Sequence, residues 1–178
     1  MDCVQGHPQG LQMQSTDRGW EARMAKHWET LDDKTPQAFT AELEALLGEL
    51  PPESAVILFE RGSAQDSTGN PDLAVPLYQA ALAAGLDAPR RRRAVIQLAS
   101  SLRSLDQPER AVELLTRELT EPEDELSGAA RGFLALALAD LGQEREALAL
   151  SLTALADYLP RYNRSLSRYA ATLLDPLR

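Results

Sequence analysis

Three stretches of the sequence resemble one another and recur at a nearly constant spacing. They read GNPDLAVPLYQAAL from Gly69, DQPERAVELLTREL from Asp106 and GQEREALALSLTAL from Gly142. Their central alanines, Ala74, Ala111 and Ala147, lie 37 and 36 residues apart. A period of roughly 34 to 40 residues with two helices per unit is typical of a helical solenoid, in which each unit must stack on a neighbour to bury its apolar face. The period therefore predicts an all-α chain of stacked helix pairs.

Small residues recur in register with the central alanines. Twelve residues before each of them lie Gly62, Ala99 and Ala135, and seven residues after the first and third lie Ala81 and Ala154. The middle unit has Glu118 at that second position. Because helix axes approach closely only where side chains are small, we expect burial of five alanines at helix contacts: Ala74, Ala99, Ala111, Ala135 and Ala147.

With Gly69, Asp106 and Gly142 in the turns between paired helices, this arrangement resembles the tetratricopeptide-repeat family. The segments LFERGSAQDSTGNPDLAVPLYQAALAAGL, AVIQLASSLRSL and LALALADLGQEREALALSLTALADYLPRYNRSL also resemble a group of small bacterial cytosolic members without an assigned function. The resemblance implies a right-handed superhelix of antiparallel helix pairs and a role in binding other proteins. It leaves a homodimer open and carries over no catalytic residue.

The N-terminal part of the chain lacks the repeat. Residues 1–16 are rich in Gln and Gly without helical or strand periodicity, which predicts a disordered tail. Trp20, Met24, Trp28 and Leu31 then follow a helical spacing, and Thr35 before Pro36 is a signal for the start of a second helix. We therefore expect a helix pair over residues 17–50.

The expected organisation after this pair is a stack of three tetratricopeptide-like repeats, at about 53–86, 90–121 and 125–159, closed by a capping helix at 161–175. Every segment beyond residue 16 shows either helical periodicity or a turn signal. We expect a chain that is more than about 60% helical and contains no sheet.

Charge and composition narrow the range of partners. The net charge of −9 and the pI near 4.7 disfavour nucleic acid, since affinity for phosphate backbones comes mostly from clustered Lys and Arg. The sequence has one cysteine, no secretory signal and no uninterrupted apolar run of roughly 18 residues. These features predict a cytoplasmic protein that binds neither nucleic acid nor membrane.

Catalytic and metal-binding patterns are weak. The two histidines are His7 and His27, of which the second falls within the first predicted helix, and Cys3 has no neighbour placed to lower its pKa. Neither a Cys/His metal spacing nor a phosphate-binding Gly-rich loop occurs. We expect no enzyme activity, no cofactor and no metal site.

The resemblance to tetratricopeptide repeats places the first helix of each pair on the concave, ligand-binding surface. The positions that it nominates are Phe59, Glu60, Ser63 and Asp66 in the first unit, Arg93, Gln97, Ser100 and Arg103 in the second, and Phe133 and Leu136 in the third. Among these, the four in the second unit share a stripe opposite Val95, Leu98, Ala99 and Leu102. We expect this surface to bind a peptide or a protein segment of complementary charge.

Two other functions stay open at this level. The leading helices, with Trp20, Trp28 and Phe39, are candidates for packing on a second copy, which would make the protein a homodimeric scaffold. An enzyme built on helical repeats would need an apolar pocket with convergent polar groups, which a sequence does not reveal.

The run Arg90 to Arg93 departs from the usual rule for helix starts, where anions are favoured over cations. One interpretation is a solvated turn balanced by nearby acids such as Asp87. The other is a basic lip that binds an acidic peptide or a phosphate group. The sequence leaves both interpretations open.

Overall fold

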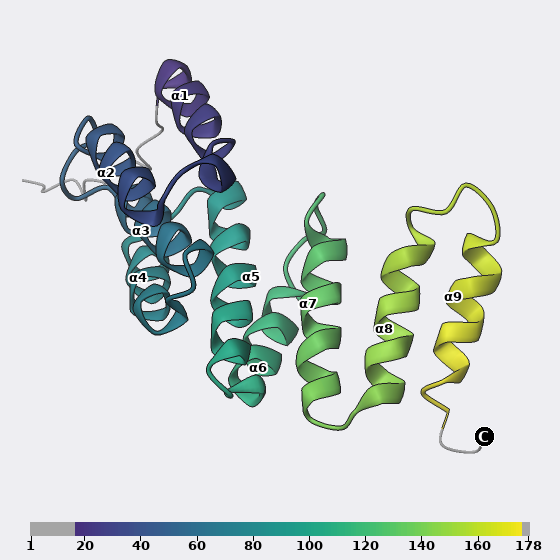
Figure 1. Cartoon of the computed structure of the whole chain (residues 1–178). Helices are drawn as coiled ribbons and strands as arrows, with labels where there is room; N and C mark the ends of the chain where they lie inside the picture. Colours follow the sequence, from purple (N-terminus) through teal and green to yellow (C-terminus); the bar gives the residue numbers. More distant parts are fainter. Residues whose placement is uncertain (1–16, 176–178) are drawn as a thin grey trace, which may run out of the picture. The chain divides into compact units, whose positions relative to one another are not determined.

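The computed structural model describes residues 17–175, which form two compact units; the first ends at Ser54 and the second begins at Ala55. The first unit contains helix α1 (Arg18–Trp28), a 3-10 turn η1 (Leu31–Asp33) and helix α2 (Pro36–Leu47) (Figure 1). The expected tail at residues 1–16 lies outside the described part of the chain.

Capping side chains define where the helices of the first unit begin. The Asp17 carboxylate accepts a hydrogen bond from the amide of Gly19 at 2.6 Å, and the Thr35 hydroxyl accepts one from the amide of Ala38 at 3.3 Å. Each bond satisfies an amide that has no partner within its helix. The buried apolar side chains follow the predicted helical spacing and are Trp20, Met24, Phe39, Leu43 and Leu47.

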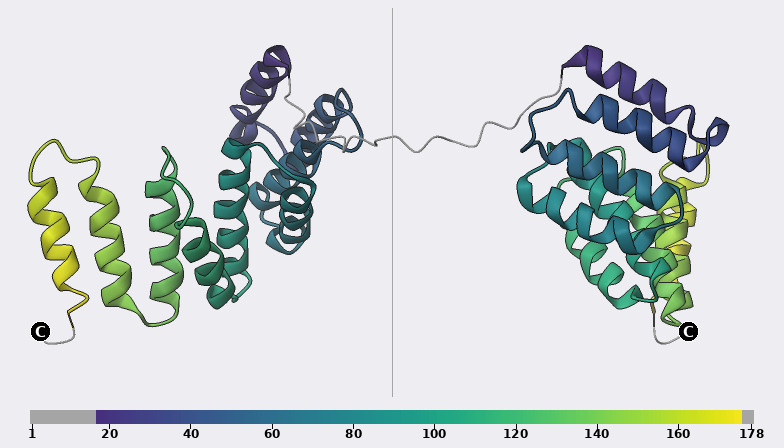
Figure 2. Two further views of the ribbon diagram at one scale, coloured as in Figure 1. Left: turned by 180° about the vertical axis from the view of Figure 1, so that it is seen from behind. Right: turned by 60° about the vertical axis from the view of Figure 1, so that its left-hand side comes forward.

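Seven helices build the second unit, and each packs on the next along the chain (Figure 2). They are α3 (Ala55–Ser67), α4 (Pro71–Ala84), α5 (Ala88–Ser104), α6 (Pro108–Glu118), α7 (Ser127–Asp140), α8 (Glu144–Ala156) and α9 (Asn163–Thr172). No strand occurs between residues 17 and 175. The predicted all-α repeat fold is therefore confirmed. Separately, none of the described helices is long and apolar enough to cross a membrane.

The three turns inside the pairs share one backbone geometry. Gly69, Asp106 and Gly142 have φ angles of 84°, 58° and 72°, in the left-handed region that ends many helices. In each turn the amide of the next residue bonds to the carbonyl five positions earlier, at 2.9 to 3.0 Å: Asn70 to Gln65, Gln107 to Leu102, and Gln143 to Leu138. The positions that the sequence predicted as turns are thus three copies of one helix-ending motif.

Small residues lie where the paired helices approach. All five alanines that the register nominated are buried: Ala74, Ala99, Ala111, Ala135 and Ala147. At Gly62 on α3, an added Cβ would lie 2.9 Å from the ring of Tyr78 on α4. Tyr78 is fully buried, so its ring has no open space into which to move. The glycine is therefore required by the contact between these two helices.

Candidate functional site

The first helices of the three pairs lie next to one another and present the predicted ligand-binding surface, since α3 packs on α5 and α5 packs on α7. Polar side chains bridge the neighbouring helices. The Ser63 hydroxyl donates to the Gln97 side-chain oxygen at 3.3 Å, and the Ser101 hydroxyl donates to the Asp66 carboxylate at 2.9 Å. Burial raises the pKa of the Asp66 carboxyl, and the hydrogen bond from Ser101 opposes this rise.

Three of the ten predicted binding residues are buried. Phe59, Glu60 and Ser63 are at most 2% exposed, so they cannot touch a ligand directly. The family-derived register did not reveal this, because α3 packs on both α4 and α5 and these contacts enclose that part of its surface. These three residues support the surface from beneath, and Asp66 beside them is half-buried.

The predicted stripe on α5 is accessible. Arg93 is exposed, with its guanidinium carbon 5.1 Å from the centre of the Phe59 ring, at the distance of a cation–π contact. Gln97, Ser100 and Arg103 are half-buried, and Arg103 forms an ion pair with Asp140 of α7. The opposite stripe is buried, as expected, at Val95, Leu98, Ala99 and Leu102.

The α7 part of the surface is apolar. Phe133 is half-buried against the core of the second unit, and Leu136 is 47% exposed. We call the accessible set the α5–α7 surface; it consists of Arg93, Gln97, Ser100, Arg103, Phe133 and Leu136. Two guanidinium groups at one side and two apolar side chains at the other can bind a segment that carries both acidic and apolar residues.

The arginine run fits neither interpretation from the sequence in full. Arg90 donates to the Asp87 carboxylate at 2.7 Å. Asp87 therefore does balance the charge of one arginine of the run, as the first interpretation expects. Arg92, however, is only 4% exposed. It is therefore neither part of a solvated turn nor part of a basic lip, since both would require an exposed side chain. Arg93 is the one member of the run that faces solvent with no carboxylate within ion-pair distance in the described structure.

Arg92 joins three segments through its guanidinium. Its Nε donates to Glu118 of α6 at 2.9 Å, and one terminal nitrogen donates to Asp124 at 2.9 Å and Ser127 at 2.8 Å. The other terminal nitrogen donates to the carbonyl of Pro122 at 2.9 Å. Glu118, itself buried, also accepts from Arg91 at 2.8 Å. The replacement of a small residue by Glu118 in the middle unit was the sequence signal for this network.

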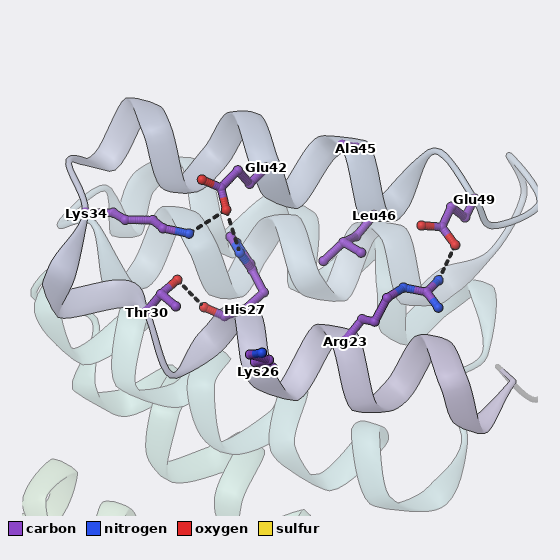
Figure 3. Close-up of a pocket in the computed structure, with 9 residues that line it drawn as sticks. All are labelled: Arg23, Lys26, His27, Thr30, Lys34, Glu42, Ala45, Leu46 and Glu49. Atoms are coloured by element: carbon purple, nitrogen blue, oxygen red, sulfur yellow. Dashed lines mark hydrogen bonds and ion pairs between the residues drawn. The ribbon is translucent and has the colours of Figure 1, made fainter.

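A pocket lies between α1 and α2 in the first unit (Figure 3). The residues around it are Arg23, Lys26, His27, Thr30, Lys34, Glu42, Ala45, Leu46 and Glu49. Its charges largely neutralise one another, since Arg23 pairs with Glu49 and Lys34 pairs with Glu42. No group of three potential metal ligands occurs among the described residues.

His27 of this pocket serves in packing. Its ring is buried and stacks on the ring of Phe39, with the two centres 4.2 Å apart. Burial and then the nearby Lys34 ammonium lower the pKa of the His27 imidazole below its ordinary 6.5, against an opposing effect of Glu42, whose carboxylate lies 3.7 Å from Nδ1. The neutral ring is therefore favoured in the folded unit.

Comparison with known families agrees with this architecture. A family model described as "Tetratrico peptide repeat" matches residues 55–173, which is most of the chain and nearly all of the described second unit. The chain belongs to the tetratricopeptide-repeat family. No curated protein and no solved structure matches it. Tetratricopeptide repeats mediate protein–protein interactions in general.

Replacing Arg92 by Met tests the network around Glu118. We expect the free energy of unfolding to fall by up to about 3–5 kcal/mol in urea titrations. Glu118 then keeps only its pairing with Arg91, and Asp124, Ser127 and the carbonyl of Pro122 lose their bonds to Arg92. The matched variant Arg93→Met should lose no more than about 1 kcal/mol, since Arg93 is exposed and makes only the contact with Phe59. Adding Glu118→Leu to Arg92→Met should restore part of the stability. Equal losses in Arg92→Met and Arg93→Met would contradict the network.

The lowered pKa of His27 predicts acid sensitivity of the first unit. Between the ordinary pKa of 6.5 and the lower folded-state pKa, the unfolded state binds more protons, so stability decreases as the pH falls through this window. Both tryptophans of the chain, Trp20 and Trp28, lie in this unit and report its unfolding by fluorescence. His27→Gln should flatten the stability profile below about pH 6.5. Parallel profiles for the wild type and the variant would argue against this role.

Proposed function

We propose that the protein is a non-catalytic interaction module that binds a partner polypeptide on its α5–α7 surface. The observation that carries the proposal is the arrangement on α5. Arg93, Gln97, Ser100 and Arg103 share its accessible stripe, while the opposite stripe is buried in the core. Packing explains the apolar stripe. On the accessible stripe, Gln97 accepts a hydrogen bond from Ser63 and Arg103 pairs with Asp140, so the groups most available to a ligand are the exposed guanidinium of Arg93 and the hydroxyl of Ser100.

The side chains of the α5–α7 surface indicate which residues a bound segment would need. A bound segment would place an acidic side chain near the exposed guanidinium of Arg93, and it would place apolar side chains on Phe133 and Leu136. Arg103 already has Asp140 as its partner, so a second carboxylate there would have to compete with an existing ion pair. Arg93 is thus the better anchor for an acidic group, and extended or helical peptides both fit such a surface.

A scaffold assembled through the leading helices has less support. The aromatic residues that suggested it are used within the chain, because Trp20 and Phe39 are buried and Trp28 packs on Phe39 with ring centres 5.1 Å apart. The Trp20 indole also donates to the carbonyl of Leu46 at 2.9 Å. Of these three aromatic side chains, only Trp28 is partly exposed.

Reversing both arginines tests the proposed surface. We expect Arg93→Glu with Arg103→Glu to abolish recovery of the partner proteins that the wild type co-purifies, because an acidic segment would meet four units less positive charge. Thermal unfolding followed by circular dichroism should stay within about 1 kcal/mol of wild type, as is usual for surface changes.

The control carries the same change of charge on another helix. Arg110 and Arg117 are exposed on α6, a helix that contributes no residue to the α5–α7 surface. Arg110→Glu with Arg117→Glu should recover the same partners as wild type in quantitative mass spectrometry. Recovery that is unchanged in the first variant, or lost equally in both variants, would reject the α5–α7 surface as the binding site.

A further inference from the structure

Helix α8 exposes apolar positions that are covered in the two preceding units. The residues one and eight positions after the central alanine are Val75 and Leu82 in the first unit and Val112 and Leu119 in the second, and all four pack against the core. Their counterparts in the third unit, Leu148 and Leu155, are 49% and 48% exposed. Comparison of equivalent positions in the three units thus shows that α8 has an exposed apolar surface where α4 and α6 have a covered one.

The position four residues after the central alanine shows the same difference. It holds Tyr78 in the first unit and Leu115 in the second, and both side chains are fully buried. In the third unit it holds Ser151, which is exposed. Leu148, Ser151 and Leu155 recur at spacings of three and four, so they share one face of α8. We call these three residues the open α8 face.

The cause lies in the placement of α9. In the first two units the next helix pair continues the stack, so that α5 covers α4, α7 covers α6, and the first helices also pack on each other. Helix α9 packs on α8 without comparable packing on α7. Figure 1 and the left view of Figure 2 show α7, α8 and α9 side by side in a row. The third pair therefore lacks the contact between successive first helices that the earlier pairs have, namely α3 with α5 and α5 with α7.

We infer that the open α8 face binds the same face of a second copy of this chain, with the two α8 helices antiparallel. A two-fold axis near Ser151 would set Leu148 of one copy against Leu155 of the other, twice in the interface. Ser151 and the half-buried Leu152 lie between these leucines, so no charged side chain falls in the middle of the contact. Two chains that each carry a net charge of −9 can approach at a neutral face without strong local repulsion.

The ends of the face are complementary in charge under this pairing. Glu144 begins α8, and Arg161 follows Tyr158 at the other end; both are exposed. In the described structure neither has an ion-pair partner. An antiparallel arrangement brings Glu144 of each copy to the end that carries Arg161 of the other. A parallel arrangement would set like charges together at both ends.

The size of the face sets the strength of the dimer. Helix α8 has 13 residues and is thus about 20 Å long. One helix face of this length gives an interface at the small end of the range for specific complexes, so the expected dissociation constant is roughly micromolar. This inference concerns a different surface from the α5–α7 surface and does not depend on the proposed function.

Sedimentation equilibrium with charge-swap variants tests the pairing. The wild type should shift with concentration from the monomer mass of 19.5 kDa toward twice that mass. Leu148→Lys alone and Leu155→Glu alone should each weaken association at least about tenfold, because each places two charges in an apolar contact. The double variant should recover association, since Lys at 148 then meets Glu at 155 of the other copy at both places. The control Leu73→Lys, at a leucine of α4 that is 51% exposed, should associate as wild type does.

Three outcomes would overturn the inference. They are a wild type that stays monomeric into the high micromolar range, association that Leu148→Lys leaves unchanged, and a double variant that stays monomeric although circular dichroism shows it folded. Because the α5–α7 arginines are intact in all these variants, recovery of partner proteins reports separately on the proposed function. Loss of association with unchanged partner recovery would support the open α8 face and leave the proposed function standing.

Discussion

The helix pairs of the second unit depend on a contact in which small side chains let two backbones come close together. At the first pair this requirement is strict, since the space that a Cβ on Gly62 would need is occupied by the buried ring of Tyr78. The other pairs meet at alanines, of which Ala99, Ala111, Ala135 and Ala147 are all buried. Close packing fixes the angle at which the two helices of a pair cross. Because each pair stacks on its neighbour, this angle also determines where the next pair lies.

The surfaces available for binding are what this stacking leaves uncovered. On the first helices it leaves a polar stripe on α5 beside apolar residues on α7, which is the α5–α7 surface. On the third pair, Leu148 and Leu155 are exposed, whereas their counterparts Val75, Leu82, Val112 and Leu119 pack against the core. Both proposed interactions therefore use side chains that the packing of the helix pairs leaves accessible.

Much of the fold could be predicted from the sequence because its signals are local. The spacing of Ala74, Ala111 and Ala147 defines the repeat, and Gly69, Asp106 and Gly142 mark turns through a backbone conformation that few residues adopt. The accessible stripe on α5 could be predicted from the resemblance to tetratricopeptide repeats together with helical periodicity. The partners of the arginine run could not be predicted, because Arg92 reaches Glu118, Asp124 and Ser127, which lie 26 to 35 residues away. The burial of Phe59, Glu60 and Ser63 likewise depends on how α3 packs with its neighbours.

The stability of a single glycine variant tests the dependence of the stack on close helix approach most directly. Gly132 on α7 is the reference, since a Cβ there would meet nothing within 4 Å. Alanine at 132 should raise the free energy of unfolding by about 0.5–1 kcal/mol through helix propensity and a less flexible unfolded chain. Alanine at 62 should instead lower it by about 1–3 kcal/mol, as expected for overpacking against Tyr78. A Gly62→Ala variant as stable as Gly132→Ala in urea unfolding would contradict the account.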